Sequence, residues 1–208
     1  RAQCAAFNTT DDTEPGRGWP EDRGTEPMIR AINSRLPEDV LITDAQLVDL
    51  GFEPIAGARS KGYSYTIISS PHRPLWDRKS VYHTWHELDA KRMHEAAQHL
   101  IGEHDFASMA AMGHGRQTTV RTIHDCTVSA EADEAPRGSF ASQRVTIDVS
   151  GNGFLWNMVR ILAGTLHEVG RGRTDPADIP RILQATDRTA AGPTLPPEGL
   201  CLEWIRYE

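Results

Sequence analysis

A set of basic, aromatic and amide side chains in this 208-residue chain has the composition of a nucleotide-binding site. The set consists of Lys61, Tyr63, Tyr65, Arg121 and Arg160, together with the amides Asn152 and Asn157. Arginine and lysine neutralise phosphates, and an aromatic ring can stack on an unpaired base. Each residue alone is more often structural, because a tyrosine in a strand usually packs and a surface arginine is usually solvated. As a set, they favour a cleft that takes an anionic nucleotide.

Other chemistries find less support in the spacing of the residues. No histidine or cysteine pair stands at an HxxxH or CxxC interval with a third ligand at a suitable position, which argues against a metal site. No GxSxG turn is present to carry a serine nucleophile. The acid of the run Gly172-Arg-Thr-Asp175 is interpreted as a helix N-cap, because Pro176 and Asp178 follow it.

Two helices are predicted to position these residues. Within 150–170, apolar side chains recur at helical period over 154–166, which predicts a helix with one face in the core. Arg160 and the amides gather at its N-terminal end, where free backbone N–H groups favour an anion. A second helix is predicted over 89–101, with Asp89 as its N-cap.

The remaining segments alternate between strand and helix signals. Residue alternation predicts strands at 3–7, within 39–50, and at 59–69, 118–130, 140–149 and the C-terminus. Short helices are expected at 26–36 and 176–185. Because strands outnumber helices, we expect an α+β fold with a mostly antiparallel sheet and its helices packed on one face.

Composition narrows the class of protein. The chain is 38% hydrophobic and 25% charged, which is typical of a soluble domain. No apolar run approaches the ~18 residues that cross a bilayer, so we expect a cytoplasmic protein. The net charge of −7 restricts any RNA site to a local patch. An odd number of cysteines, Cys4, Cys126 and Cys201, all in apolar runs, predicts buried free thiols.

Seven segments resemble the TruA-type tRNA pseudouridine synthases. They are 3–7, NSRLPED at 33–39, KGYSY at 61–65, LDAKRMHEAAQHLIGEHDF at 88–106, TTVR at 118–121, GFLWNMVR at 153–160 with Gly164, and RTAAGPTLPPEGL at 188–200. Their order and spacing hold from end to end, except for the polar insert at 10–25, which we expect to be a flexible loop. The GFLxxMVR and AGPTxPPxGL stretches are specific to that family.

The resemblance implies the pseudouridine-synthase fold over 1–208 and isomerisation of uridines at positions 38 to 40 of tRNA, in the anticodon stem-loop. It implies no cofactor, no metal and no membrane, and a homodimer with tRNA as its partner. An aspartate of the family attacks the flipped nucleotide, and a tyrosine lies against the base. By position that tyrosine is Tyr63, with Lys61 before it. Arg121 and Arg160 match the cleft arginines, and Arg160 is expected to orient the aspartate as well.

The chain also departs from the family pattern. The nucleophilic aspartate belongs to a GRTDxGVHA motif, which is expected upstream of Arg1 together with the first part of the sheet. Asp175 is not followed by GVHA, so the role is not carried onto it. Glu53 and Gly57 replace the His and the Asp or Ser that usually precede the tyrosine strand. We therefore expect an N-terminally truncated fragment that is inactive by itself. A non-catalytic RNA-binding remnant and a purely structural domain with dispersed cations remain alternatives.

Overall fold

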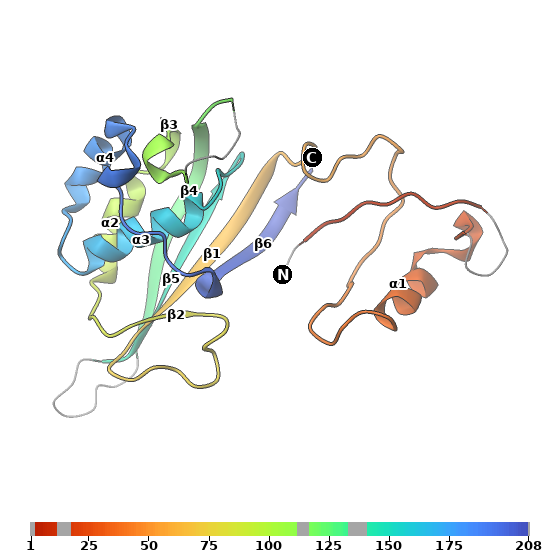
Figure 1. Cartoon of the computed structure of the whole chain (residues 1–208), viewed down its shortest axis with the longest axis horizontal. Helices are drawn as coiled ribbons and strands as arrows, with labels where there is room; N and C mark the ends of the chain where they lie inside the picture. The colour runs from red at the N-terminus through yellow and green to blue at the C-terminus, as the bar shows by residue number, and fades with distance from the viewer. Residues whose placement is uncertain (1–2, 12–17, 112–116, 133–140, 208) are drawn as a thin grey trace. The chain divides into compact units, whose positions relative to one another are not determined.

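A six-stranded sheet is the centre of residues 58–208 (Figure 1). Its strands are β1 (Ser60–Ser69), β2 (Tyr82–Thr84), β3 (Gly102–Asp105), β4 (Val120–Ala132), β5 (Gln143–Gly151) and β6 (Leu200–Arg206). The order is β2-β1-β5-β4-β3, and β6 shares the outer edge of β1 with β2. Among the described strands only the β1–β2 pairing is parallel. The predicted α+β class with a mostly antiparallel sheet is confirmed.

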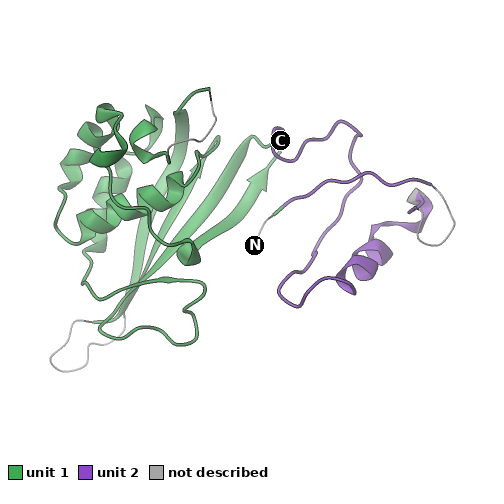
Figure 2. Cartoon of the chain, viewed as in Figure 1, with its two compact units in different colours: residues 1–3, 58–208 green, residues 4–57 purple. Residues whose placement is uncertain are grey.

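The structure is a computed structural model that describes residues 3–11, 18–111, 117–132 and 141–207. Their contacts divide the chain into two units, residues 1–3 and 58–208 in one and residues 4–57 in the other (Figure 2). Part of the loop predicted at 10–25 lies outside the described residues. Within the described residues, no helix is long and apolar enough to span a membrane.

Strand alternation gives the sheet one apolar face. Side chains on this face are almost completely buried, among them Tyr65, Ile67, Cys126, Val145, Ile147 and Val149. β-branched and aromatic side chains fill the pleated surface of a strand well, which explains why these segments pair. The helices α2 (Ala90–Gln98), α3 (Met158–Gly170) and α4 (Ile179–Ala185) cover the same face (Figure 1). The expectation that the main helices lie on one face is confirmed.

The helices begin where their caps predict. Asp89 accepts backbone N–H groups from Lys91 and Arg92, both at 3.0 Å, at the start of α2. Asp175 and Asp178 form a capping box at the turn before α4, so the N-cap interpretation of Asp175 is confirmed. Eleven of the thirteen residues of α3 are buried, which makes it the centre of the helical layer.

The unit of residues 4–57 contains α1 (Thr25–Asn33) and long segments without regular structure. The strands predicted at 3–7 and within 39–50 are wrong, because neither segment forms a strand in the described structure. Phe7, Leu41 and Leu50 are 63%, 71% and 89% exposed. A strand needs a neighbouring strand to take its backbone hydrogen bonds, and alternation alone cannot show whether one is present.

The three cysteines are free. Cys126 is buried, and burial raises the pKa of its thiol to about 12, so the thiol stays protonated at neutral pH. Cys201 is partly buried, but Cys4 is exposed. The expectation of a buried thiol is therefore wrong for Cys4, whose predicted strand does not form.

Three neighbouring carboxylates lie on the opposite, polar face of the sheet. Asp148 of β5 pairs with Thr127 of β4, one diagonal step from Asp125. Both aspartates line an open hollow of about 160 Å³ together with Glu203, which accepts a 2.7 Å hydrogen bond from Ser64. Burial, followed by the charges of Glu203 and Asp125, raises the pKa of Asp148. Ionised Asp148 therefore destabilises the folded state.

Asp148→Asn is expected to raise the free energy of unfolding at pH 7 by ~0.2–1 kcal/mol, the usual size of a like-charge effect between strands. Because the pKa of Asp148 is raised on folding, the native state holds this proton more tightly. Wild-type stability should then fall as the pH rises above about 4, towards the folded-state pKa, and the variant should lose this decline. Thermal unfolding measured against pH checks the prediction. Exposed Asp39 supplies the control, and an equal gain in Asp39→Asn would contradict it.

Candidate functional site

The strand ends that carry the predicted residues meet at one end of the sheet. Lys61 of β1 pairs with Gly151, the last residue of β5. On its other side Gly151 pairs with Ile123, close to the N-terminal end of β4. The antiparallel register thus brings Lys61, Arg121 and the loop 152–157 to the same end, where α3 begins.

Tyr63 forms an aromatic pair with Phe154 of that loop. The ring centroids lie 5.0 Å apart, and the planes meet at 79°, which is an edge-to-face contact. Both rings are partly buried and pack against the core. Burial also raises the pKa of the Tyr63 hydroxyl, so the side chain is neutral at physiological pH. The ring of Tyr63 is therefore fixed in direction but not completely covered.

Arg160 is held from two sides. Its Nε donates to the backbone oxygen of Leu195 at 2.6 Å, and its Nη1 donates to Oδ1 of Asn157 at 2.9 Å. The backbone N–H of Leu195 in turn donates to the carbonyl of Arg160 at 3.3 Å. Hydrogen bonds from a charged, planar guanidinium are strong and directional, so these contacts fix its orientation.

The two predicted amides build the loop around Arg160. Asn157 has a φ of 60°, a left-handed conformation that asparagine tolerates better than most residues. Oδ1 of Asn152 accepts a hydrogen bond from the backbone N–H of Thr122 at 3.0 Å. The backbone N–H of Asn152 donates to the Thr122 carbonyl, also at 3.0 Å. The side-chain oxygens of both amides thus have partners within the protein. Their role in substrate binding stays a prediction.

Arg121 and Lys61 complete the group. A Cβ built on Gly153 would lie 3.8 Å from Cδ of Arg121, so this arginine runs alongside the loop 152–157. Its Nη1 donates to the carbonyl of Thr118 at 3.1 Å. We call the group formed by Lys61, Tyr63, Arg121, Asn152, Phe154, Asn157 and Arg160 the β1–α3 site. Lys61, Arg121 and Arg160 lie at one end of the sheet, which argues against the alternative of a purely structural domain with dispersed cations.

Tyr65 does not belong to this site. Its side chain is completely buried, and its hydroxyl donates to the carbonyl of Pro196 at 2.6 Å. The prediction that places Tyr65 in the set around a nucleotide cleft is therefore wrong, because its side chain is completely buried. The loop 190–199 covers Tyr65 and also supplies the Leu195 carbonyl to Arg160. The sequence did not predict that this loop supports Tyr65 and Arg160. The signal that could have indicated it is the family-specific AGPTxPPxGL stretch.

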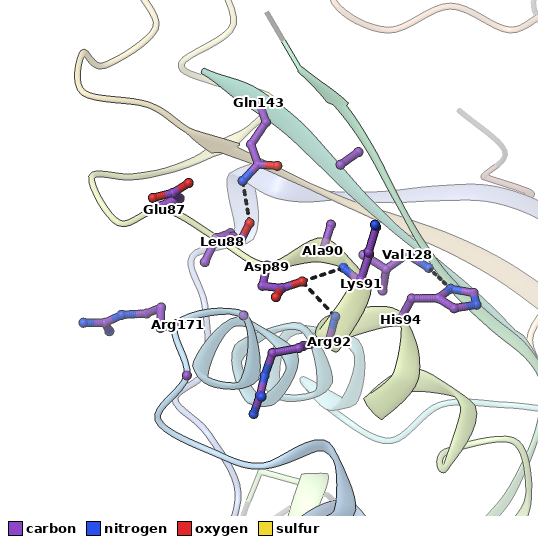
Figure 3. Close-up of a pocket in the computed structure, with 13 residues that line it drawn as sticks. Glu87, Leu88, Asp89, Ala90, Lys91, Arg92, His94, Val128, Gln143 and Arg171 are labelled. Carbon is purple, nitrogen blue, oxygen red and sulfur yellow. Dashed lines mark hydrogen bonds between the residues drawn. The ribbon is translucent and has the colours of Figure 1, made fainter. Parts of the chain in front are cut away.

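A larger hollow, of about 1080 Å³, lies away from the β1–α3 site (Figure 3). Figure 3 shows hydrogen bonds between the side chains of Asp89, Gln143 and His94, which line the hollow, and neighbouring backbone groups. Asp89 caps α2, Nε2 of Gln143 donates to the Leu88 carbonyl at 2.6 Å, and Nδ1 of His94 accepts from Val128 at 3.2 Å. None of the predicted site residues lines it. No group of three or more metal-ligating side chains occurs in the described parts of the chain.

Comparison with known proteins adds to this geometry. A family model described as tRNA pseudouridine synthase matches residues 96–208, which include Arg121 and Arg160. The chain is similar to "tRNA pseudouridine synthase A" of Geotalea uraniireducens, with 44% identity over 176 residues, or 85% of this chain and 68% of that protein. A protein of the same name from Caldicellulosiruptor saccharolyticus is 42% identical over 183 residues, which cover 88% and 71% of the two chains. Another, from Pelobacter propionicus, is 38% identical over 207 residues, which cover 100% and 77%.

Proposed function

The chain belongs to the tRNA pseudouridine synthase family, and from this premise we propose that it acts in the isomerisation of uridine to pseudouridine in the anticodon stem-loop of tRNA. Positions 38 to 40 of the tRNA are part of the proposal. The observation that carries it is the fixed guanidinium of Arg160, at the end of the sheet where Tyr63 presents its ring. The two features suit the two halves of a nucleotide, phosphate and base.

Five members of the β1–α3 site have a proposed task. Tyr63 lies against the flipped base, while Lys61 and Arg121 neutralise phosphates. Arg160 neutralises phosphate and orients the attacking carboxylate, because a preorganised cation stabilises charge without moving during the reaction. Asn157 is a positioning residue, since its Oδ1 holds Nη1 of Arg160 at 2.9 Å.

The reaction balances without a cofactor. The bond from the sugar C1′ to N1 of uracil breaks, a bond from C1′ to C5 forms, C5 loses its proton and N1 gains one. A covalent aspartate intermediate divides this rearrangement into two steps. The 208 residues contain no GRTDxGVHA motif, and Asp175 is occupied in a capping box and an ion pair with Arg92 at 3.4 Å. We therefore propose that these residues bind RNA but do not turn it over by themselves.

Assembly and location complete the proposal. The family resemblance supports a homodimer in the cytoplasm, with tRNA as the partner. Sedimentation equilibrium of the purified chain, with and without tRNA, tests the dimer. A second candidate function is that of a non-catalytic RNA-binding protein that uses the same site. It predicts the same binding and no product.

Tyr63→Leu is expected to weaken binding of an anticodon stem-loop RNA by roughly 5- to 100-fold, the effect of losing one base–aromatic stack. Tyr63→Phe keeps the ring and should bind within about threefold of wild type. Fluorescence anisotropy of labelled RNA measures both, with a blunt duplex that has no loop as the control ligand. Equal affinity for stem-loop and duplex, or no effect of Tyr63→Leu, would contradict the proposed site.

Tritium release from uracil-5-labelled tRNA tests the chemistry separately. The lost C5 hydrogen appears in water only if the C-glycoside forms. The 208 residues alone are expected to release none. Turnover that survives both Tyr63→Leu and Arg160→Ala would show that the reaction occurs elsewhere in the chain.

A further inference from the structure

The loop of residues 71–81 connects β1 and β2 (Figure 1) and contains a tryptophan, Trp76. Trp76 is 95% exposed, and its neighbour Leu75 is 63% exposed. Burying a tryptophan removes on the order of 150–250 Å² from water, so such exposure leaves a large hydrophobic stabilisation unused. Trp76 makes no hydrogen bond or ring contact with any residue that the structure describes. Folding of this unit therefore does not explain its presence.

The loop itself is anchored by other residues. Nη2 of Arg144 on β5 donates to Oδ2 of Asp77 at 2.6 Å. The backbone N–H of Ser80 donates to the Asp77 carbonyl at 2.8 Å, and Nη1 of Arg78 donates to the Leu75 carbonyl at 3.1 Å. Val81, at the end of the loop, is buried. A structured loop thus presents Trp76 to solvent.

The charge of this loop favours an anionic ligand. Arg73, Arg78 and Lys79 are exposed, whereas the one carboxylate of the loop, Asp77, is paired with Arg144. This local positive charge occurs in a chain whose net charge is −7. Tryptophan and arginine also occur in protein interfaces. An exposed ring beside several cations, however, is the combination that single-stranded nucleic acid requires, because the ring stacks on a base while the cations neutralise phosphates.

The loop and the β1–α3 site lie at opposite ends of β1. Six residue steps separate Tyr63 from Ser69, which corresponds to about 20 Å along the strand. One nucleotide cannot contact both, but a single folded RNA can. The loop is therefore a separate contact and not an extension of the first site.

We propose that residues 71–81 form a second RNA contact, in which Trp76 stacks on an unpaired base of tRNA and Arg78 and Lys79 neutralise the adjacent phosphates. The inference rests on the proposed function, because both sites take the same RNA.

The test compares Trp76→Leu with Leu75→Ala in the 208-residue chain. Trp76→Leu removes the π-face but keeps apolar bulk, and Leu75→Ala removes a neighbouring exposed apolar side chain that cannot stack. With a tRNA transcript as the probe, Trp76→Leu should raise Kd roughly 5- to 100-fold, and Leu75→Ala should stay within about twofold. Arg78→Gln combined with Lys79→Gln should lower the slope of log Kd against log salt by about 1.4.

Tyr63→Leu, measured in parallel, separates the two proposals. Weaker binding in both Trp76→Leu and Tyr63→Leu supports both. An unchanged Kd in Trp76→Leu with a raised Kd in Tyr63→Leu overturns the second contact and leaves the proposed function standing. An unchanged Kd in both variants, or no binding by wild type, overturns both. A change in sedimentation of Trp76→Leu without a change in Kd overturns the RNA contact and identifies a protein interface.

Discussion

Replacing Gly164 by alanine should lower the free energy of unfolding by about 3 kcal/mol or more. A Cβ built on Gly164 would lie 1.8 Å from the backbone oxygen of Pro193, and one on Gly192 would lie 2.6 Å from backbone atoms of Gly164 and Thr165. The backbones of α3 and of the loop 190–199 are thus in direct contact. No flexible side chain lies between them that could make room for the added methyl group. Alanine normally favours a helix over glycine by up to ~1 kcal/mol, and a net loss would therefore report the contact itself.

The same substitution should weaken RNA binding, because the loop that it displaces supports the site. Leu195 holds Arg160 through its carbonyl, and Pro196 holds Tyr65. Urea denaturation followed by circular dichroism measures the stability, and anisotropy measures the Kd of a stem-loop RNA. Gly51→Ala is the matched control, because nothing lies within 4 Å of the added Cβ, and its effect should stay within about 0.5 kcal/mol. Wild-type stability in Gly164→Ala would show that α3 and the loop are not in contact.

Arg160→Ala should weaken binding of the stem-loop RNA at least tenfold and reduce the salt slope by about 0.7 to 0.9, the effect of one lost phosphate contact. It should also lower the free energy of unfolding by about 2 kcal/mol. The Leu195 carbonyl and Oδ1 of Asn157 lose a charged donor in this variant, and part-buried acceptors without partners are costly.

Two further variants separate the charge of Arg160 from its orientation. Arg160→Lys keeps the charge and should restore the salt slope, but lysine has no planar fork and should not restore stability. Asn157→Ala should leave the slope unchanged and raise Kd by a smaller factor. Arg181 is the control arginine, since it is 76% exposed and paired with Asp178 three residues away. If Arg181→Ala matched Arg160→Ala in both Kd and stability, a special role for Arg160 would be excluded.

The sequence determined the parts of this protein that depend on neighbours in the chain. Helical periodicity identified α3, and the caps at Asp89 and Asp175 identified where α2 and the turn before α4 begin. Strand alternation identified β1 and the β4–β5 hairpin. These signals lie within one or two turns of helix or a few residues of strand, so a linear pattern contains them. The GFLxxMVR and AGPTxPPxGL stretches indicated the tRNA pseudouridine synthase family, which the match over residues 96–208 confirms.

Only the tertiary structure decided which of the predicted basic and aromatic residues belong to the β1–α3 site. Tyr63 and Tyr65 share one face of β1 and follow the same alternation. Tyr65 is nevertheless completely buried, and its hydroxyl donates to the carbonyl of Pro196, 131 residues away in the chain. The strand pattern at 3–7 has no partner in the described structure. The loop that contains the exposed Trp76 is anchored to β5 by a hydrogen bond between Arg144 and Asp77. Burial and pairing depend on contacts between distant segments. A local pattern records which face a side chain takes, but not what covers that face.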